Sequence, residues 1–191
     1  MRWLIGRLWL RIFGWTLVGT LPDAPKWVFI AAPHTSNWDL PFMLATAWSL
    51  RVRVSWLGKH TLFEGPFAPF MRWLGGLPVD RRAPHGLVAQ VVGEFARRER
   101  LVLAIPPEAT RSYRDFWKSG FYHIAVGADV PVGTGFLDFA QKRCGLGPTL
   151  RLTGDVRADM DRVRAFYEPL RGKVPADQGP VRLREEGEAS P

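Results

Sequence analysis

Cysteine is nearly absent from this chain: Cys144 is the single one among 191 residues. One cysteine cannot form an internal disulfide, and no second thiol or close histidine accompanies it as a structural zinc site requires. We therefore expect a protein suited to a reducing compartment, stabilised by a packed core. The 47% share of hydrophobic residues is enough for such a core and argues against a wholly disordered chain.

Several motifs that mark bound ligands or nucleophiles are also missing. There is no His-x-x-x-His pair and no Asp-x-Asp-x-Asp-Gly loop, so we expect no metal site. There is no Gly-x-x-x-x-Gly-Lys loop, which argues against a bound nucleoside triphosphate. Without a Gly-x-Ser-x-Gly turn, a serine nucleophile of the α/β-hydrolase kind is not expected. We predict no resident cofactor.

The chain has no uncharged run near its start that could cross a bilayer. A spanning helix needs about 20 apolar residues, but Arg7 and Arg11 interrupt the apolar segment, and the uncharged stretch after them runs from Ile12 to Pro22. The two arginines share one helical face, with apolar residues on the rest. We predict an amphipathic helix over residues 1–21 that lies in the plane of a membrane. A terminal helix that packs on the core is the alternative.

No export signal is expected, because the arginines break the apolar region and no Ala-x-Ala-like cleavage site follows. The prediction is a peripheral or monotopic protein on the cytoplasmic face of the membrane.

Acidic residues are in the minority. Lysine and arginine total 26 against 18 for aspartate and glutamate, a net charge of +8. This excess favours an anionic partner, and nucleic acid, a phospholipid surface and a phosphate-bearing substrate all qualify. The chain also has nine tryptophans, a residue that prefers the membrane–water interface. The aromatic content therefore favours an anionic membrane surface.

The alternation of apolar runs and helical patterns predicts an α/β fold: a single domain with a mixed central sheet flanked by helices. We assign residues 22–172 to this domain. Residues 173–191 are rich in proline, glycine and glutamate, and we expect them to be a disordered tail. The expected strands are 27–32, 51–57, 77–79, 101–105, 130–139 and 149–153, and the expected helices are 39–50, 86–100, 119–128 and 158–170.

The most informative pattern starts at His34, just after the expected strand 27–32, with Asp39 five residues on. A histidine oriented by a carboxylate can act as a positioned general base. The pair alone is a weak signal and counts only with its context. Ser36 is an unsuitable nucleophile for this base, because residues so close together on a turn rarely align for the reaction.

Two further motifs follow in order, each closing an apolar run: Gly75-Gly-Leu-Pro-Val-Asp-Arg81 and Pro107-Glu-Ala-Thr-Arg-Ser112. Together the three blocks resemble the glycerolipid acyltransferase family, whose lysophosphatidic acid acyltransferases carry His-x4-Asp, Gly-x4-Asp-Arg and Pro-Glu-Gly-Thr-Arg blocks. The resemblance covers roughly residues 25 to 140.

The resemblance implies direct acyl transfer. His34 would deprotonate an acceptor hydroxyl as it attacks the carbonyl of an acyl thioester, and Asp39 would hold the imidazole. The implied acceptor is a lysophospholipid, foremost 1-acyl-glycerol-3-phosphate, in phospholipid biosynthesis. The implied donor is acyl-coenzyme A or acyl carrier protein, each a co-substrate rather than a cofactor.

The acceptor phosphate needs cationic partners, and the motifs supply candidates. Arg81 and Arg111 suit it because guanidinium groups match phosphate oxygens with paired hydrogen bonds. Thr110 offers a hydroxyl and an amide, and Lys59 would extend the positive charge. Glu108 belongs to the acceptor-binding block in the family, whereas in isolation it reads equally well as a structural ion-pair partner.

Ala109 departs from the family pattern, which has glycine at this position. If the residue needs a positive φ, alanine strains the turn by about 1 kcal/mol or more. If glycine only allows the acceptor to approach closely, one methyl group narrows the pocket and alters the accepted head group.

Other functions stay open. Within the acyltransferase reading, the acceptor can be another lysolipid or polar lipid. The protein can also be a non-catalytic basic protein that lies on anionic membranes, in which the three motifs no longer have a catalytic function. A nucleic-acid binder would explain the charge, but the arginines are scattered and no recognised binding module is present, so we expect no nucleic-acid partner.

Overall fold

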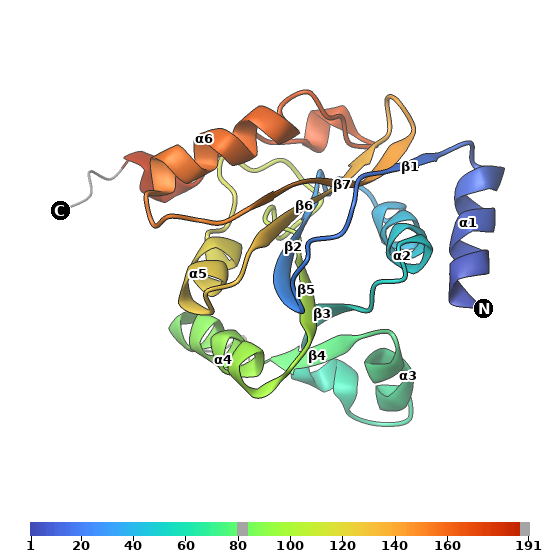
Figure 1. Ribbon diagram of the computed structural model, residues 1–191, viewed down its shortest axis with the longest axis horizontal. Coiled ribbons are helices and arrows are strands. Elements are labelled where there is room, and N and C mark those ends of the chain that lie inside the picture. Colours follow the sequence, from blue (N-terminus) through green and yellow to red (C-terminus); the bar gives the residue numbers. More distant parts are fainter. Residues whose placement is uncertain (80–83, 188–191) are drawn as a thin grey trace.

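A mixed sheet forms the centre of the computed structural model, which describes residues 1–79 and 84–187. In this part of the chain the sheet has seven strands in the order β1-β7-β6-β2-β5-β3-β4 (Figure 1). Neighbouring strands are parallel except β6 and β7, which are antiparallel. The strands are β1 (Thr16–Val18), β2 (Lys26–Ala32), β3 (Val54–Lys59), β4 (Gly76–Val79), β5 (Leu101–Ile105), β6 (Val132–Asp138) and β7 (Arg143–Leu150).

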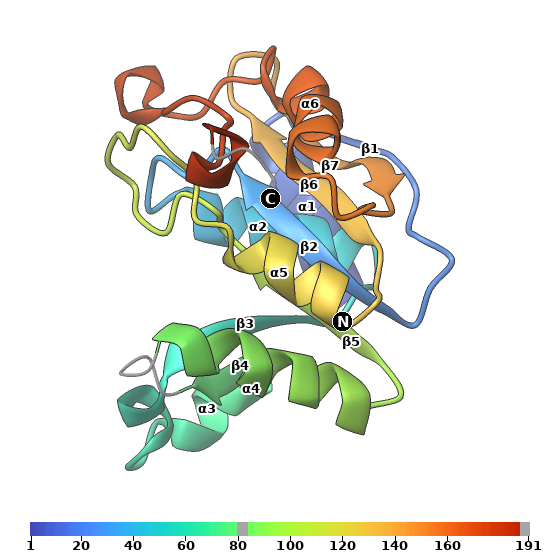
Figure 2. The same cartoon turned by 90° about the vertical axis from the view of Figure 1, so that its left-hand side faces the viewer.

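Helices cover both faces of the sheet, which confirms the predicted α/β fold with a mixed sheet flanked by helices. Helices α1 and α2 lie on one side, and α5 and α6 lie on the other (Figures 1 and 2). The α-helices are α1 (Arg2–Ile12), α2 (Asp39–Ser49), α3 (Ala68–Trp73), α4 (Pro84–Arg97), α5 (Gly120–Gly127) and α6 (Val156–Tyr167), and the 3-10 helices are η1 (His60–Phe63), η2 (Pro175–Asp177) and η3 (Arg184–Gly187).

Strand β2 is central and apolar on both faces. Val28 and Ile30 are 0% exposed and join the core cluster under α4, α5 and α6. Trp27 and Phe29 point the other way, into a second cluster with Met43 of α2. Successive side chains of a strand face opposite sides of its sheet. A strand buried on both sides therefore needs a continuous apolar run, as this one has.

The parallel strands β2, β5, β3 and β4 all end at one edge of the sheet. The first motif follows β2 and the third follows β5. The second motif contains β4, and its Asp80 and Arg81 lie outside the described residues. The topology thus brings all three motifs toward the same edge, although they are far apart in the sequence.

Strand β7 corrects the expected strand over residues 149–153. It begins at Arg143 and ends at Leu150, because a tight turn after β6 starts the return strand early. In that turn Asp138 accepts hydrogen bonds from the amides of Ala140 and Gln141. Two glycines and a proline within β7 concealed it in the sequence.

The helix predicted over residues 1–21 is shorter than expected. Helix α1 ends at Ile12, and Gly14 follows with a φ of 70°, a left-handed conformation that glycine adopts without strain. Thr16–Val18 then pairs with β7 as strand β1. The N-terminal helix therefore exists, but the segment after it belongs to the sheet. Across residues 1–79 and 84–187, no helix is both long enough and apolar enough to cross a membrane.

Helix α1 packs directly on α2. At Gly6 a Cβ atom would lie 2.6 Å from the carbonyl oxygen of Ala45, so glycine permits the close contact. Gly6 and Leu10 are buried on this side. The opposite side stays exposed although it is apolar: Leu4 is 62% and Leu8 59% exposed. Both readings of the sequence thus have a structural counterpart, a core-packing face and an uncovered apolar face.

The C-terminal segment corrects the prediction of a disordered tail. Val181 and Leu183 are buried in the main core cluster, and Leu183 pairs with Trp117 in an isolated bridge. Residues 173–187 are therefore packed on the domain, and residues 188–191 lie outside the described part of the chain. The composition of this stretch is typical of disorder, but Val181 and Leu183 alternate with arginines. This alternation was the sequence signal for a segment packed on the domain.

Candidate active site

His34 lies at the carboxyl edge of the sheet, two residues after β2, with 22% of its side chain exposed. Its Nδ1 is 3.0 Å from Oδ2 of Asp39. When Nδ1 donates to the carboxylate, Nε2 is the nitrogen that can accept a proton. The structure thus brings together the two residues that the sequence singled out, and their catalytic role stays a prediction.

The loop between β2 and α2 holds Asp39 in place. Its Oδ2 accepts hydrogen bonds from the amides of Thr35, at 2.8 Å, and Ser36, at 2.9 Å. Asp39 is also the first residue of α2, where the helix dipole favours negative charge. The carboxylate is 4% exposed, so its orientation is set by these bonds rather than by water.

Ser36 is occupied within the same loop. Its hydroxyl oxygen accepts a hydrogen bond from the amide of Trp38 at 3.2 Å, which stabilises the turn into α2. The hydroxyl thus has a structural contact in this turn, and the expectation that Ser36 is not the nucleophile stays a prediction.

Glu108, from the third motif, supports His34 from the loop after the neighbouring strand β5. Its Oε1 accepts a hydrogen bond from the main-chain amide of His34 at 3.1 Å. Among the described residues, no lysine or arginine forms an ion pair with Glu108. The contact is therefore different from the ion-pair role considered from the sequence.

Two carboxylate oxygens beside His34 are buried without a hydrogen-bond partner in the described chain: Oε2 of Glu108 and Oδ1 of Asp39. Burial raises the pKa of Glu108 to about 7. The hydrogen bond from the His34 amide and the charge of the imidazole lower this pKa, whereas Asp39 raises it. Burial therefore favours the neutral form of Glu108 in the folded protein.

The loop after Glu108 contains the residue that departs from the family pattern. Ala109 has a φ of 57°, in the left-handed region that glycine adopts without strain. The first of the two explanations for the usual glycine therefore applies: the turn requires a positive φ.

The cationic candidates differ in what the structure shows of them. Arg111 is exposed on the loop after β5, and Thr110 accepts a weak hydrogen bond from the Ser112 amide at 3.4 Å. Lys59 is exposed at the carboxyl end of β3, on the same edge of the sheet. Arg81 lies outside the described residues.

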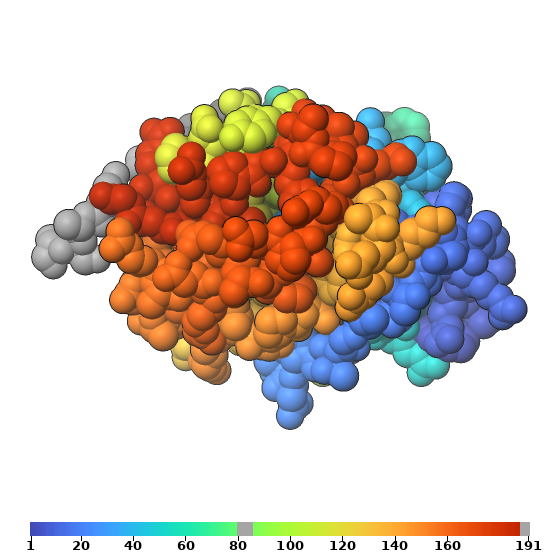
Figure 3. Space-filling view, turned by 90° about the horizontal axis from the view of Figure 1, so that it is seen from above, coloured from blue at the N-terminus to red at the C-terminus, as the bar shows by residue number. Residues whose placement is uncertain are grey.

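A C-terminal contribution to the site was missed from the sequence. The Thr35 hydroxyl accepts a hydrogen bond from the Val174 amide at 3.1 Å. A Cβ atom at Gly172 would lie 2.6 Å from the same hydroxyl oxygen, so the backbone passes very close to the loop. Gln178 braces this turn, accepting from the Gly172 amide and donating to the Leu170 carbonyl. In Figure 3 the C-terminal segment covers this side of the molecule, beside the loop that follows β5.

The described residues include no group of three or more histidine, cysteine, aspartate or glutamate side chains placed to hold a metal ion.

The protein has an α/β fold with a mixed central sheet, and a His–Asp pair lies at the carboxyl edge of this sheet. Residues 20–135 match the acyltransferase family, and the chain belongs to this family. The family and fold expected from the three motifs are confirmed.

One solved structure similar to this chain is PlsC, the 1-acyl-sn-glycerophosphate (LPA) acyltransferase from Thermotoga maritima. The two share 16% sequence identity with a TM-score of 0.55, over 87% of this chain and 73% of that one. At this identity the similarity shows the fold alone. No curated protein matches the chain.

Replacing Glu108 by glutamine should flatten the pH dependence of stability. The folded protein keeps Glu108 protonated up to about pH 7, whereas the unfolded chain releases the proton near its ordinary pKa of 4.5. The folded state thus binds more protons in this window, so the free energy of unfolding falls as the pH rises through it and levels off above. The loss is at most about 3 kcal/mol. Urea unfolding at several pH values measures this loss.

Glu99→Gln, at an exposed site, is the control and should keep the wild-type dependence of the unfolding free energy on pH. The same dependence in Glu108→Gln would contradict the raised pKa of Glu108.

Ala109→Gly should stabilise the protein by about 1 kcal/mol, because it relieves the left-handed strain of the side chain. Chemical denaturation measures the change. Ala89→Gly is the matched control: Ala89 is exposed within α4, where glycine should instead cost about 1 kcal/mol. A loss of stability in both variants would show that the strain at residue 109 is not relieved.

Proposed function

We propose that the protein transfers a fatty acyl group from an acyl thioester to the free hydroxyl of a lysophospholipid, foremost 1-acyl-glycerol-3-phosphate, in phospholipid biosynthesis. One observation carries the proposal: a partly exposed imidazole is held through Nδ1 by a buried carboxylate, at the edge where the other two motifs converge. This arrangement suits a general base that acts on a hydroxyl brought by the substrate.

The proposed reaction uses this geometry. Nε2 of His34 takes the proton of the acceptor hydroxyl as its oxygen attacks the thioester carbonyl, which forms a tetrahedral intermediate. The carbon–sulfur bond then breaks, and the imidazolium returns the proton to the departing thiolate. Asp39 stabilises the imidazolium throughout. The products are an ester and a free thiol, and no acyl-enzyme is needed.

The acceptor phosphate would be bound by the cationic residues of the same edge. Arg111 has an exposed guanidinium on the loop that also carries Glu108, and Lys59 ends the adjacent strand β3. Thr110 adds a hydroxyl, and Arg81 is the corresponding candidate in the second motif. Such groups bind a phosphate monoester through charge-assisted hydrogen bonds.

An anionic membrane surface would deliver the lipid. The exposed face of α1 carries apolar side chains, and exposed aromatic residues lie on α3 and just before it: Phe67, Phe70 and Trp73. The guanidinium of Arg2 lies 4.0 Å from the centroid of the Trp73 ring, which places the start of α1 next to the end of α3. Apolar and aromatic side chains flanked by arginines favour binding in the plane of the interface. We propose peripheral or monotopic attachment from the cytoplasmic side.

Loss of the base should abolish transfer while the fold is kept. His34→Ala and Asp39→Asn should lower kcat/KM roughly 10²–10⁴-fold, measured by the formation of phosphatidic acid from an acyl thioester and 1-acyl-glycerol-3-phosphate. His123→Ala is the matched control, because His123 is exposed on α5.

A parallel series of lysolipids with and without a phosphate monoester tests the acceptor. Wild-type turnover in His34→Ala would refute the mechanism, and equal rates for all acceptors would refute the phosphate site.

The double variant Leu4→Gln/Leu8→Gln should weaken sedimentation with anionic vesicles at least about tenfold, because each buried leucine contributes about 1.5–3 kcal/mol. Both side chains are exposed, so the fold should survive the change. Val126→Gln removes an exposed apolar side chain from α5, on the other side of the sheet, and should bind like the wild type. Undiminished binding of the double variant would refute attachment through α1.

A further inference from the structure

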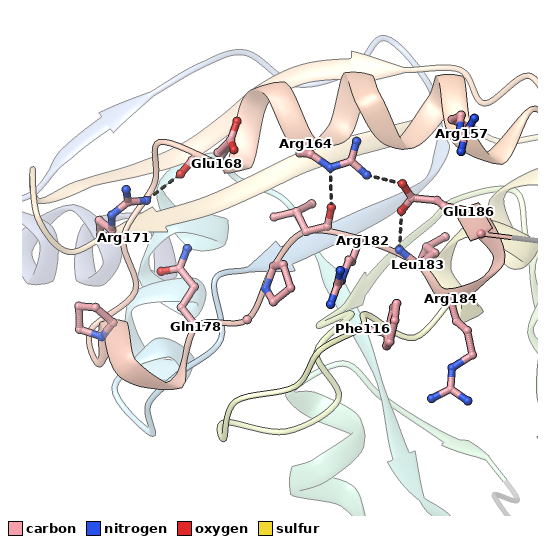
Figure 4. Close-up of a pocket in the computed structure, with 15 residues that line it drawn as sticks. Phe116, Arg157, Arg164, Glu168, Arg171, Gln178, Arg182, Leu183, Arg184 and Glu186 are labelled. Carbon is pink, nitrogen blue, oxygen red and sulfur yellow. Dashed lines mark hydrogen bonds and ion pairs between the residues drawn. The ribbon is translucent and has the colours of Figure 1, made fainter.

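A cavity of about 650 Å³ lies between α6 and the C-terminal segment, and His34 is not among its lining residues. Figure 4 shows that side chains from both segments surround it, with Phe116 contributed by the loop after β5. Five of its lining residues are arginines: Arg157, Arg164, Arg171, Arg182 and Arg184. The acyl-transfer chemistry proposed above leaves this cavity unused.

The cavity has an excess of positive charge. Two glutamates line it with the five arginines, which leaves three positive charges. Glu186 is already engaged, since it pairs with Arg164 and accepts from the Leu183 amide. In the described chain, none of the other four arginines has a carboxylate partner. Guanidinium groups that share a cavity repel one another unless an anion lies between them.

Two of these arginines are held in position by aromatic and main-chain contacts. The guanidinium carbons of Arg182 and Arg184 lie 4.6 and 5.4 Å from the centroid of the Phe116 ring. Nε of Arg182 also donates to the carbonyl of Asp115 at 2.8 Å. These contacts orient the side chains without neutralising them. Guanidinium groups presented in this way suit phosphate oxygens.

The walls of the cavity are also the supports of the active site. At one end Gln178 braces the turn whose Val174 amide bonds to the Thr35 hydroxyl. At the other end the Trp117 amide donates to the Arg182 carbonyl, which joins the C-terminal segment to the loop that carries Glu108. The walls of the cavity are therefore hydrogen-bonded to the two loops that hold His34.

We propose that this cavity binds the phosphates of a nucleotide, namely the phosphorylated nucleotide end of an acyl-coenzyme A donor. The assignment rests on the proposed acyl transfer. Such a donor carries several phosphates at one end and its thioester at the other, joined by a long flexible arm. It needs a cationic site near, but not at, the reacting carbonyl. A lysolipid phosphate lies only a few bonds from its hydroxyl and would have to bind close to His34, for which Arg111, on the loop that carries Glu108, is the candidate.

Calorimetric titration with coenzyme A tests the assignment without turnover. Arg182→Gln should weaken binding about tenfold or more, because a charge-assisted hydrogen bond to phosphate is lost, and Arg182→Lys should recover part of the affinity. Arg157→Gln, which removes a guanidinium with no hydrogen bond to the described chain, is the second variant if Arg182→Gln unfolds. Arg100→Gln, an exposed arginine just before β5, is the matched control and should bind like the wild type.

The ligand itself is tested with fragments and competitors. Pantetheine, which lacks the nucleotide, should bind weakly and equally to all variants, and the affinity for coenzyme A should fall as salt is added. Unchanged coenzyme A binding in both folded arginine variants would overturn the proposal. It would equally be overturned if inorganic phosphate or 1-acyl-glycerol-3-phosphate bound with the same arginine dependence, or if acyl carrier protein bound and coenzyme A did not.

Failure of this assignment can be told apart from failure of the proposed function. If the wild type binds coenzyme A in an arginine-dependent way but acylates no lysolipid, the assignment of the cavity is supported and the proposed acyl transfer is refuted. If transfer occurs, Arg182→Gln should raise the KM for acyl-coenzyme A several-fold and leave the KM for the acceptor unchanged. An unchanged KM for the donor would remove the cavity from the reaction.

Discussion

The arrangement of the site depends on one short hydrogen-bonded loop between β2 and α2. Oδ2 of Asp39 accepts the amides of Thr35 and Ser36 while it faces Nδ1 of His34. The same carboxylate thus ends the loop, begins the helix and orients the imidazole. Because the carboxylate is buried, the loss of one of these partners would leave part of its charge uncompensated, which is costly. The orientation of His34 is therefore linked to the start of α2.

The rest of the molecule braces this loop from two sides. Glu108, on the loop after β5, binds the His34 amide, and the C-terminal segment binds the Thr35 hydroxyl through Val174. The C-terminal segment is itself anchored by Leu183 in the core. A chain that ended before this anchor would lose one wall of the site, although no residue of the tail touches the imidazole in the contacts described. Ala109, with its strained left-handed conformation, lies in the same loop as Glu108. The contacts that this loop makes offset a local cost of about 1 kcal/mol.

The molecule separates its apolar and cationic surfaces. The exposed apolar and aromatic side chains gather on α1 and α3, whereas the arginine-lined cavity lies between α6 and the C-terminal segment. Such a division suits the proposed reaction between a membrane lipid and a water-soluble thioester, because the two substrates would approach from different phases.

The sequence by itself predicted five of the seven described strands, most helices and the pairing of His34 with Asp39, because hydrophobic periodicity and a five-residue spacing are local properties. The three motifs in order also sufficed for the family. Only the tertiary structure decided which groups meet at the edge of the sheet, because parallel strands bring together residues that are distant in the chain. It alone showed that Glu108 binds the His34 backbone and that Ala109 has a positive φ. It alone placed residues 173–187 on the domain, where burial of two apolar side chains outweighs a composition typical of disorder.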